Sequence, residues 1–550
     1  MTLGRPSAPP RAARGHDVVG NSISLTAWAT ISRVTGFARA AAIAAVLGPT
    51  YLGNTFQATN LLPNLAYEFL TGSLFASLLV PSLVRHVDLG RTRATERLVG
   101  GFLGVMIPTF AVVAGAAVAA GPLLLHVLAL GVNEPSVAAA QQHVGWILMA
   151  MLMPQVILYG IAGTGGAIQN AHGRFALAAA APALENVGVI ATMGIAAGLF
   201  GSGVTLTSVS LGELLVLGIG TTAAVGLHAG AQCWGASRVG VRMVPRFGGW
   251  RDPEVRSLAG RAIPSLGYAG LNSLRLFAVL VVANHVRGGI VAFQLALSFF
   301  YLPVNAGARP VGIAMLPRLS RLYRDGATAR FREELVHGVA RACFLTVPAA
   351  VAFATLAHPL ARAVSFGQMA GSSGVGYVAV SLVALAAGVL GEAGFVLATY
   401  ASYARHDTRS PFRAMVIRTG VSLGGMVIAF LLADGSGLLV GIGLAISAGN
   451  LLSAAQLGTR LKRELQEGSA RVGPALLRAL GAAAVMTPPA YLAARGIAAW
   501  TPSGIGRLAA IAAAAVVGSA TYLAAQRAWG SPELSSLAGD FRRLRSGGGP

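Results

Sequence analysis

Long apolar runs, separated by short polar connections, cover almost the whole chain. The runs are rich in Ala, Leu and Gly, and they lack the alternation of apolar and polar residues that is typical of barrel strands. A helix of about 20 mostly apolar residues is long enough to cross a bilayer. We therefore predict about fourteen transmembrane helices, near residues 20–47, 54–84, 98–129, 136–169, 174–200, 207–234, 254–284, 289–317, 335–356, 374–404, 412–433, 436–459, 474–496 and 504–526.

The composition agrees with a polytopic membrane protein. Of the 550 residues, 55% are hydrophobic and only 11% are charged, whereas a soluble domain has about 25% charged residues. The formal net charge is +22, and the basic charge is nearly all arginine because Lys462 is the only lysine. The arginines lie between apolar runs and not in a basic domain studded with aromatic residues, so we expect no nucleic-acid partner.

The connections alternate between arginine-rich segments and segments almost free of arginine, with Arg287 and Arg362 as exceptions. Loops rich in arginine remain in the cytoplasm when a membrane protein inserts. An even number of helices places all the arginine-rich loops on one side. We therefore predict a multi-pass protein of the cytoplasmic membrane with both termini in the cytoplasm, and basic tails at 1–17 and 529–550.

An internal repeat connects segments that lie six predicted helices apart. The segments LVPSLVRH (79–86) and AMLPRLSRLY (314–323) each place Pro, Leu and Arg at the end of a helix, and the turns at 169–182 and 402–413 also resemble each other. Repeated halves are common in transporters, with the substrate site between them. We predict an all-α polytopic membrane protein with two pseudo-symmetric six-helix lobes, at 18–235 and 236–465, and two additional helices at 466–528.

Several arginines lie inside the apolar runs. A buried arginine costs about 2.5–3.5 kcal/mol at a helix centre and by default faces a polar cavity. In the run SRVTGFAR, Arg33 and Arg39 flank Gly36 and point about 120° apart, so they can line one wide cavity. Arg275 and Arg309 lie in the repeat counterparts of the first two helices. Guanidinium groups bind phosphate oxygens in pairs and keep their charge, so we predict that these four arginines bind a phosphate-bearing substrate.

Alternative interpretations of these residues stay open. Arg33 can instead extend to water at the helix end, and Arg275 and Arg309 can each pair with a neighbouring carbonyl or carboxylate. Arg418 is either a further internal cation or an extension of the basic loop before it. Glu68 is expected either to pair with one of the two arginines of the first helix, and so to belong to the substrate site, or to be a carboxylate at the helix end that faces water.

Gly36, Pro63 and Asn64 are the predicted hinge elements, because glycine and proline allow a helix to bend. A kink at Pro63 that only shapes packing is an equally good interpretation. Glu185 lies near a cytoplasmic turn, where we expect a structural role, and Glu213 and Glu392 are weaker candidates for carrying protons.

No pattern in the sequence predicts an enzyme. Ser, His and Asp form no recognisable catalytic motif, the histidines lie mostly at helix ends or in loops, and no phosphate-binding loop is present. The two cysteines have no metal-ligand spacing. We therefore expect no catalytic residue, no cofactor, no metal and no direct use of ATP.

Several stretches, taken in order, resemble the MurJ (MviN) family of lipid II flippases, within the multidrug/oligosaccharidyl-lipid/polysaccharide exporter superfamily. SRVTGFAR (32–39) is similar to the first-helix signature of the family, and residues 60–85 resemble its second helix in the form seen among actinobacterial members. Residues 169–186, 403–413 and 316–321 resemble further family motifs. The resemblance covers roughly residues 18–465.

This resemblance implies that the chain moves lipid II, an undecaprenyl-pyrophosphate-linked peptidoglycan precursor, across the membrane by alternating access for cell wall synthesis. It also implies two lobes around a cationic cavity, with a groove for the lipid tail at the last two helices. We expect a monomer, with membrane lipids and cell-wall synthesis proteins as partners. The alternatives are an exporter of another lipid-linked glycan or a drug on the same fold, and a non-transporting scaffold for cell-wall enzymes.

The chain departs from the family pattern at positions where many members carry charge. Asn54 stands where many have an acid, Tyr67 stands where many have an arginine, and Leu297 and Ser298 replace an Asp-Arg pair. The seventh and eleventh helices carry no central aspartate, so a sodium site of the family type is not expected. We predict that Arg275 and Arg309 replace the lost charge.

Overall fold

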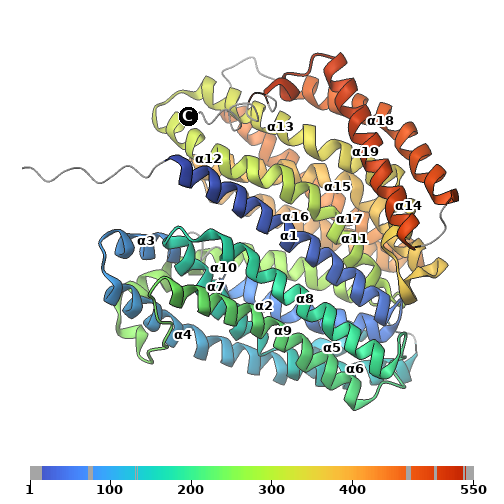
Figure 1. Ribbon diagram of the computed structural model, residues 1–550, viewed down its shortest axis with the longest axis horizontal. Helices are drawn as coiled ribbons and strands as arrows, with labels where there is room; N and C mark the ends of the chain where they lie inside the picture. The colour runs from blue at the N-terminus through green and yellow to red at the C-terminus, as the bar shows by residue number, and fades with distance from the viewer. Residues whose placement is uncertain are drawn as a thin grey trace, which may run out of the picture.

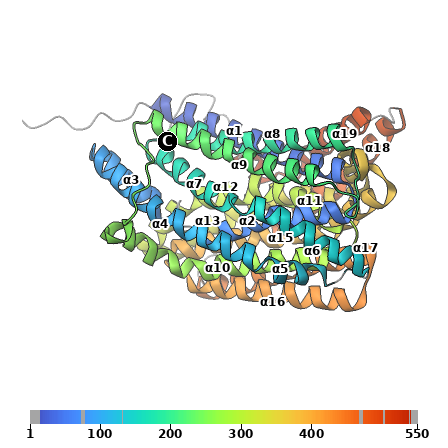
Figure 2. The same ribbon diagram turned by 90° about the horizontal axis from the view of Figure 1, so that it is seen from below.

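The computed structural model describes residues 15–71, 78–130, 132, 134–465, 472–500, 504–536 and 539, and within this part of the chain it contains helices and no strand. The long helices run roughly side by side in both views (Figures 1 and 2). Thirteen described helices are long and apolar enough to cross a membrane. They match thirteen of the predicted spans, and the second span comprises α2 (Tyr51–Thr71) and α3 (Val80–Asp88). The predicted all-α polytopic class is confirmed.

Three predicted spans are each divided into two helices beside a proline. The third span is divided before Pro122, the fourth at Pro154, and the eighth at Pro303, where a π-helical turn over Val304–Ala308 follows. Proline lacks the N–H that would continue the backbone hydrogen bonds. The helices of the first six spans are α1 (Gly15–Leu47), α2, α3, α4 (Thr92–Ala119), α5 (Gly121–Ala129), α6 (Pro135–Leu152), α7 (Gln155–Ala171), α8 (Phe175–Phe200) and α9 (Leu211–Arg238).

The second set of helices follows a short 3-10 helix at Gly249–Arg251. It repeats the same packing, because α10 packs against α16 as α1 packs against α8, six spans earlier. Its members are α10 (Pro253–Ala283), α11 (Gly289–Pro303), α12 (Arg309–Arg324), α13 (Thr328–Thr355), α14 (Ala357–Val364), α15 (Ser372–Ala404), α16 (Arg409–Leu432) and α17 (Gly435–Glu464), with α18 (Gly473–Trp500) and α19 (Gly504–Ala528) after them.

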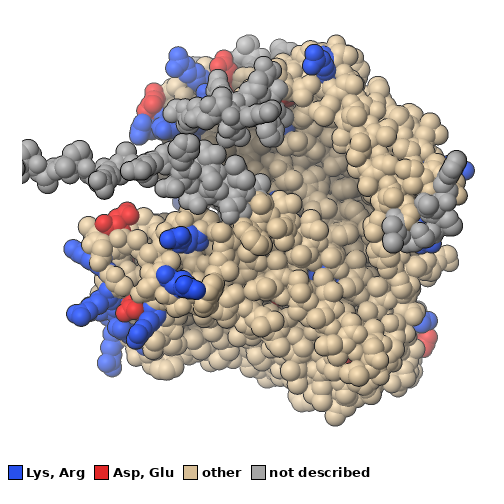
Figure 3. Space-filling view, in the orientation of Figure 1, with Lys and Arg blue, Asp and Glu red and all other residues tan. Residues whose placement is uncertain are grey.

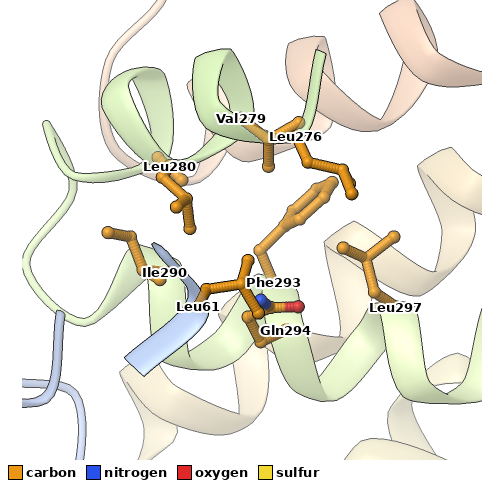
Figure 4. A pocket seen from close by; sticks show the side chains of 9 residues that line it. Leu61, Leu276, Val279, Leu280, Ile290, Phe293, Gln294 and Leu297 are labelled. Carbon is orange, nitrogen blue, oxygen red and sulfur yellow. The ribbon is translucent and has the colours of Figure 1, made fainter. Parts of the chain in front are cut away.

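The two sets of helices meet through α1 and α2 on one side and α10 and α11 on the other. Leu61 of α2 points into the space between α10 and α11 (Figure 4), where Leu276 and Phe293 also lie. The cavity that remains measures about 10 Å³, roughly the space of a single water molecule. This contact is therefore an almost solid apolar seal.

Glycine allows α15 and α17 to approach closely. A Cβ atom at Gly391 of α15 would lie 2.5 Å from the backbone nitrogen of Leu451 in α17, and one at Gly443 of α17 would lie 2.5 Å from the Cβ of Ala384. Lipid tails are as apolar as leucine, so helices in a membrane associate by close packing at small residues. These glycines therefore set the distance between the two helices.

A leucine at this contact should weaken the fold. We expect Gly391→Leu to destabilise the protein by about 1–3 kcal/mol through overpacking, and so to lower the midpoint of thermal unfolding in detergent. Gly376→Leu is the matched control on the same helix, since a Cβ there meets nothing within 4 Å. Equal midpoints for the two variants would contradict this account of the packing.

Candidate functional site

Arginine side chains gather at one end of the molecule, which is the end where α1 begins (Figures 1 and 3). Figure 3 also shows that the surface in this view is hollowed between the helices above and below. Arg33 of α1 and Arg309 of α12 are exposed, and the Arg39 side chain is 31% exposed. These three predicted binding residues are therefore accessible at the protein surface in this conformation.

One polar cluster lies where α1, α7, α8 and α9 meet, and Glu185 is at its centre. Arg39 donates from Nη1 to Glu185 Oε1 over 2.9 Å, and the Tyr159 hydroxyl donates to the same oxygen over 3.1 Å. His228 Nδ1 lies 2.9 Å from Glu185 Oε2. The Glu185 and His228 side chains are only 9% and 12% exposed, so a buried carboxylate joins four helices.

Gly36 lies inside the continuous helix α1 and faces α8. A Cβ atom there would lie 3.4 Å from Asn186 Nδ2, and this amide donates to the carbonyl of Ser32 and the hydroxyl of Thr35, each over 3.1 Å. The glycine therefore leaves room for Asn186 to cross-link the two helices. Its role as a hinge stays a prediction.

A second polar group joins α2 and α10, and Arg309 of α12 lies near it. Asn272 Nδ2 donates to Glu68 Oε2 over 3.4 Å, and Asn272 Oδ1 accepts from Arg275 Nη2 over 3.2 Å. Arg309 is close enough to interact with the charge of Glu68. Three predicted binding residues, Glu68, Arg275 and Arg309, are therefore brought together.

The expected pairing of Glu68 with an arginine of the first helix is wrong for this conformation. Arg39 pairs with Glu185, and Glu68 accepts a hydrogen bond from Asn272 of α10. Ser273 of α10 donates to the carbonyl of Leu65, one turn before Glu68, so this side of α2 faces α10. Glu68 lies exposed at the edge of that side. The rotation of α2 about its own axis determines the partner of Glu68, and this rotation could not be predicted from the sequence.

Arg275 is 2% exposed, so in this conformation it is buried and does not line an open surface. Beside it lies a buried ion pair between Arg418 and Glu392, whose side chains are 4% and 6% exposed. The Arg418 guanidinium also lies 5.0 Å from the centroid of the Phe395 ring. The interpretation of Arg418 as an extension of the basic loop is therefore wrong.

Helix α2 lies between the two polar groups. Asn64 lies near Tyr159 of the first group, and Glu68, one turn later, contacts the second. The helix continues through Pro63, which is buried. The hinge role of Pro63 and Asn64 stays a prediction, but their position connects both groups to one element.

A buried network of neutral side chains closes the end of α2 that lies away from the arginine-rich loops. Asn54 Nδ2 donates to Asn284 Oδ1 over 3.1 Å, and Asn54 Oδ1 accepts from the backbone N–H of Ile290 over 3.0 Å. Gln141 of α6 and Asn284 exchange two further hydrogen bonds of 3.0 and 2.9 Å. Asn54, Gln141 and Asn284 are each 0% exposed. We call these three residues the amide clasp.

The turns beside the amide clasp are also in contact. Gly288 has a φ of +76°, and a Cβ atom there would lie 2.1 Å from the Cα of Pro49. Only glycine fits both requirements. Asn54, one of the positions that depart from the family pattern, therefore holds the two sets of helices together at this end.

The described residues contain no group of three or more His, Cys, Asp or Glu side chains that could hold a metal ion. The polar groups described above instead contain one or two carboxylates surrounded by arginine, amide and hydroxyl groups. Such donors suit the binding of an anion.

Comparison with known proteins identifies the family. The family model described as lipid II flippase MurJ matches residues 43–521. The chain belongs to the lipid II flippase MurJ family. The predicted family is thus confirmed, and the expected actinobacterial subtype stays a prediction.

Relatives in this family cover most of the chain. It is 28% identical over 438 residues to a probable lipid II flippase MurJ of Rhizobium tropici, covering 78% of each chain. It is 24% identical over 438 residues to the lipid II flippase MurJ of Burkholderia cenocepacia, covering 78% of this chain and 82% of the relative.

Solved structures show the same fold. A lipid II flippase MurJ in an inward closed conformation superposes with a TM-score of 0.71 at 17% identity, covering 92% of this chain and 98% of that one. An inward-facing multidrug transporter of the MATE family superposes with a TM-score of 0.62 at 15% identity, covering 78% and 94%. The chain therefore has the MurJ fold, and its family membership makes it a multi-pass membrane transporter.

Four residues of these polar networks were not predicted from the sequence, namely His228, Tyr159, Gln141 and Asn284. His228 lies within α9 and not at a helix end. An ionisable residue inside a membrane helix is by default a candidate for function, so this rule could have found it. Asn284 and Gln141 gave no comparable signal, because single amides in apolar runs are common.

Removing one amide of the clasp should open this end. We expect Asn54→Ala to leave the N–H of Ile290 and the carbonyl of Val286 without their side-chain partner, at about 1–3 kcal/mol for each buried group. A cysteine at Ala58, which is 1% exposed, should then react with a maleimide about 5- to 100-fold faster in protein whose two native cysteines are replaced by serine.

The control for that experiment is Asn450→Ala, which removes another fully buried asparagine, in the α15–α17 contact. It should leave the reaction of the cysteine at position 58 unchanged. Equal acceleration by both variants would show general loosening and would contradict a role for the amide clasp in closing this end.

Proposed function

We propose that this chain moves lipid II across the cytoplasmic membrane by alternating access. Membership of the MurJ family carries the proposal, together with relatives named as lipid II flippases that match it over 78% of its length. The structural neighbours in the MATE family support a transport cycle of the same kind. The protein in this proposal is a transporter and performs no chemistry on its cargo.

The cargo would bind through its diphosphate. Arg33, Arg39 and Arg309 are accessible at the protein surface on α1 and α12, and guanidinium groups bind phosphate oxygens in pairs. The buried Arg275 would join them when the contacts of Asn272 rearrange. Gly36, Pro63 and Asn64 would allow α1 and α2 to bend during that change.

The two ends of the molecule would open in turn. In this conformation the amide clasp and the apolar seal at Leu61 support a closed end away from the arginine-rich loops. We propose that residues 18–235 and 236–465 move as two lobes about this contact, and that 466–528 add a groove for the lipid tail. Both termini would lie in the cytoplasm with the arginine-rich loops. The chain would act as a monomer beside cell-wall synthesis proteins.

Complementation tests the proposal. A cell depleted of its own lipid II flippase should grow when it receives this protein. The double variant Arg33→Ala/Arg39→Ala should fail, because each charged hydrogen bond to the cargo contributes about 1.5–3 kcal/mol. Membrane levels of the two proteins are compared by immunoblot, and growth is the readout.

The matched control is Arg362→Ala/Arg495→Ala, which removes two exposed arginines of α14 and α18. This variant should support growth as the unmodified protein does. Failure of the unmodified protein at normal membrane levels would favour another lipid-linked glycan as cargo. Growth with the Arg33→Ala/Arg39→Ala variant would show that these two arginines are not needed to bind the cargo.

A further inference from the structure

We propose that Glu185 and His228 form a proton-binding site that controls whether Arg39 is free to bind the diphosphate of the cargo. The proposal rests on the proposed function, since it concerns the same anion. It begins from the fact that Arg39 has two possible anionic partners. One is the Glu185 carboxylate, which it contacts now over 2.9 Å, and the other is a phosphate that reaches the exposed part of its side chain.

Arg39 is the member of this cluster that the cargo can reach. Its side chain is 31% exposed, whereas those of Glu185 and His228 are 9% and 12% exposed. The long guanidinium side chain can turn toward the open side, but the carboxylate remains behind it among α7, α8 and α9. Binding of a phosphate to Arg39 therefore takes the counter-ion away from a buried carboxylate.

A buried carboxylate without a counter-ion is costly, and His228 offers a replacement. In the neutral form its Nδ1–H donates to Glu185 Oε2 over 2.9 Å. One proton from water can then bind at Nε2, which gives an imidazolium and leaves the Nδ1 bond in place. The charges balance at each stage, because Glu185 pairs with Arg39 before cargo binds and with protonated His228 afterwards.

Few other titratable side chains near His228 could bind a proton in its place. Helix α9 packs against α6, α7 and α8. From α8 it faces Glu185, and from α7 the Tyr159 hydroxyl, which bonds the same carboxylate. Helix α6 meets α9 through Met151 at Gly218, ten residues before His228, and contributes no titratable group to that contact.

Proton uptake by His228 makes the affinity for cargo depend on pH. If the complex with cargo holds about one proton more than the free protein, cargo affinity must rise as the pH falls, by up to about tenfold per pH unit. Proton uptake and cargo binding then strengthen each other by the same factor. Glu185 competes with the cargo for Arg39, and the proton weakens this competition.

The test is the binding of a polyprenyl-diphosphate-linked sugar to the purified full chain in detergent at pH 6, 7 and 8. Its diphosphate is a diester and keeps its charge over this range, whereas a free terminal phosphate has a second pKa of about 6. Proton uptake is measured by calorimetry in two buffers of different ionisation enthalpy. The unmodified protein should bind several-fold more tightly at each lower pH and take up about one proton. Glu185→Gln should bind at least as tightly at pH 8 as the unmodified protein does at pH 6, without pH dependence, because nothing then holds Arg39.

Control variants separate this role from a structural one. A purely structural Glu185 predicts weaker binding in Glu185→Gln, which is the opposite result. His228→Gln should hold the affinity at pH 6 near the value that the unmodified protein shows at pH 8. Glu213→Gln removes another buried carboxylate, at the start of α9, and should behave as the unmodified protein.

A measurement without cargo distinguishes failure of this proposal from failure of the proposed function. The protonated fraction of His228 at pH 7 is read by NMR as the difference from His228→Gln, and it should be larger in Arg39→Ala than in the unmodified protein. If the protonated fraction of His228 increases in Arg39→Ala but the protein does not bind the diphosphate, the proposed function is overturned and the proton site is retained. Binding that does not change with pH, together with an unchanged His228, would overturn the proton site alone.

Discussion

The absence of water inside a membrane constrains every internal charge of this protein. An arginine there needs a carboxylate beside it or an opening to solvent. Arg39 has both, since it contacts Glu185 and is partly exposed. Arg418 has only the carboxylate of Glu392 and is buried. The position of each arginine relative to its nearest carboxylate therefore determines which helices are fixed and which are free to exchange partners.

The two halves satisfy this constraint with opposite signs. Glu185 lies on α8 and Arg418 lies on α16, and these helices hold equivalent places six spans apart. The backbone packing repeats, but α8 contributes the acid of its ion pair and α16 contributes the base. The ion pair of α8 therefore includes the partly exposed Arg39, whereas the ion pair of α16 is buried.

The hydropathy pattern was enough to predict the fold class and thirteen of the spans that the structure contains, because a membrane helix leaves a long apolar run. It could not predict which side chains meet. Glu68 faces α10 through the rotation of α2, and Arg418 lies over Phe395 through the contact of α15 with α16. Such pairings depend on helix rotation and crossing, and a one-dimensional pattern carries neither. The hydropathy pattern does show polar residues within apolar runs, such as His228, and these are candidates for the functional site.

Helix α2 holds three separate contacts in one rigid register. Asn54 belongs to the amide clasp, Leu61 fills the seal, and Glu68 meets Asn272. Each residue of a helix turns the chain by about 100° and advances it by about 1.5 Å. One inserted or deleted residue between Asn54 and Glu68 would therefore turn one end away from its partner while the other stayed in place. Over evolution this segment can change by substitution but not in length, whereas the loops beyond it can gain and lose residues.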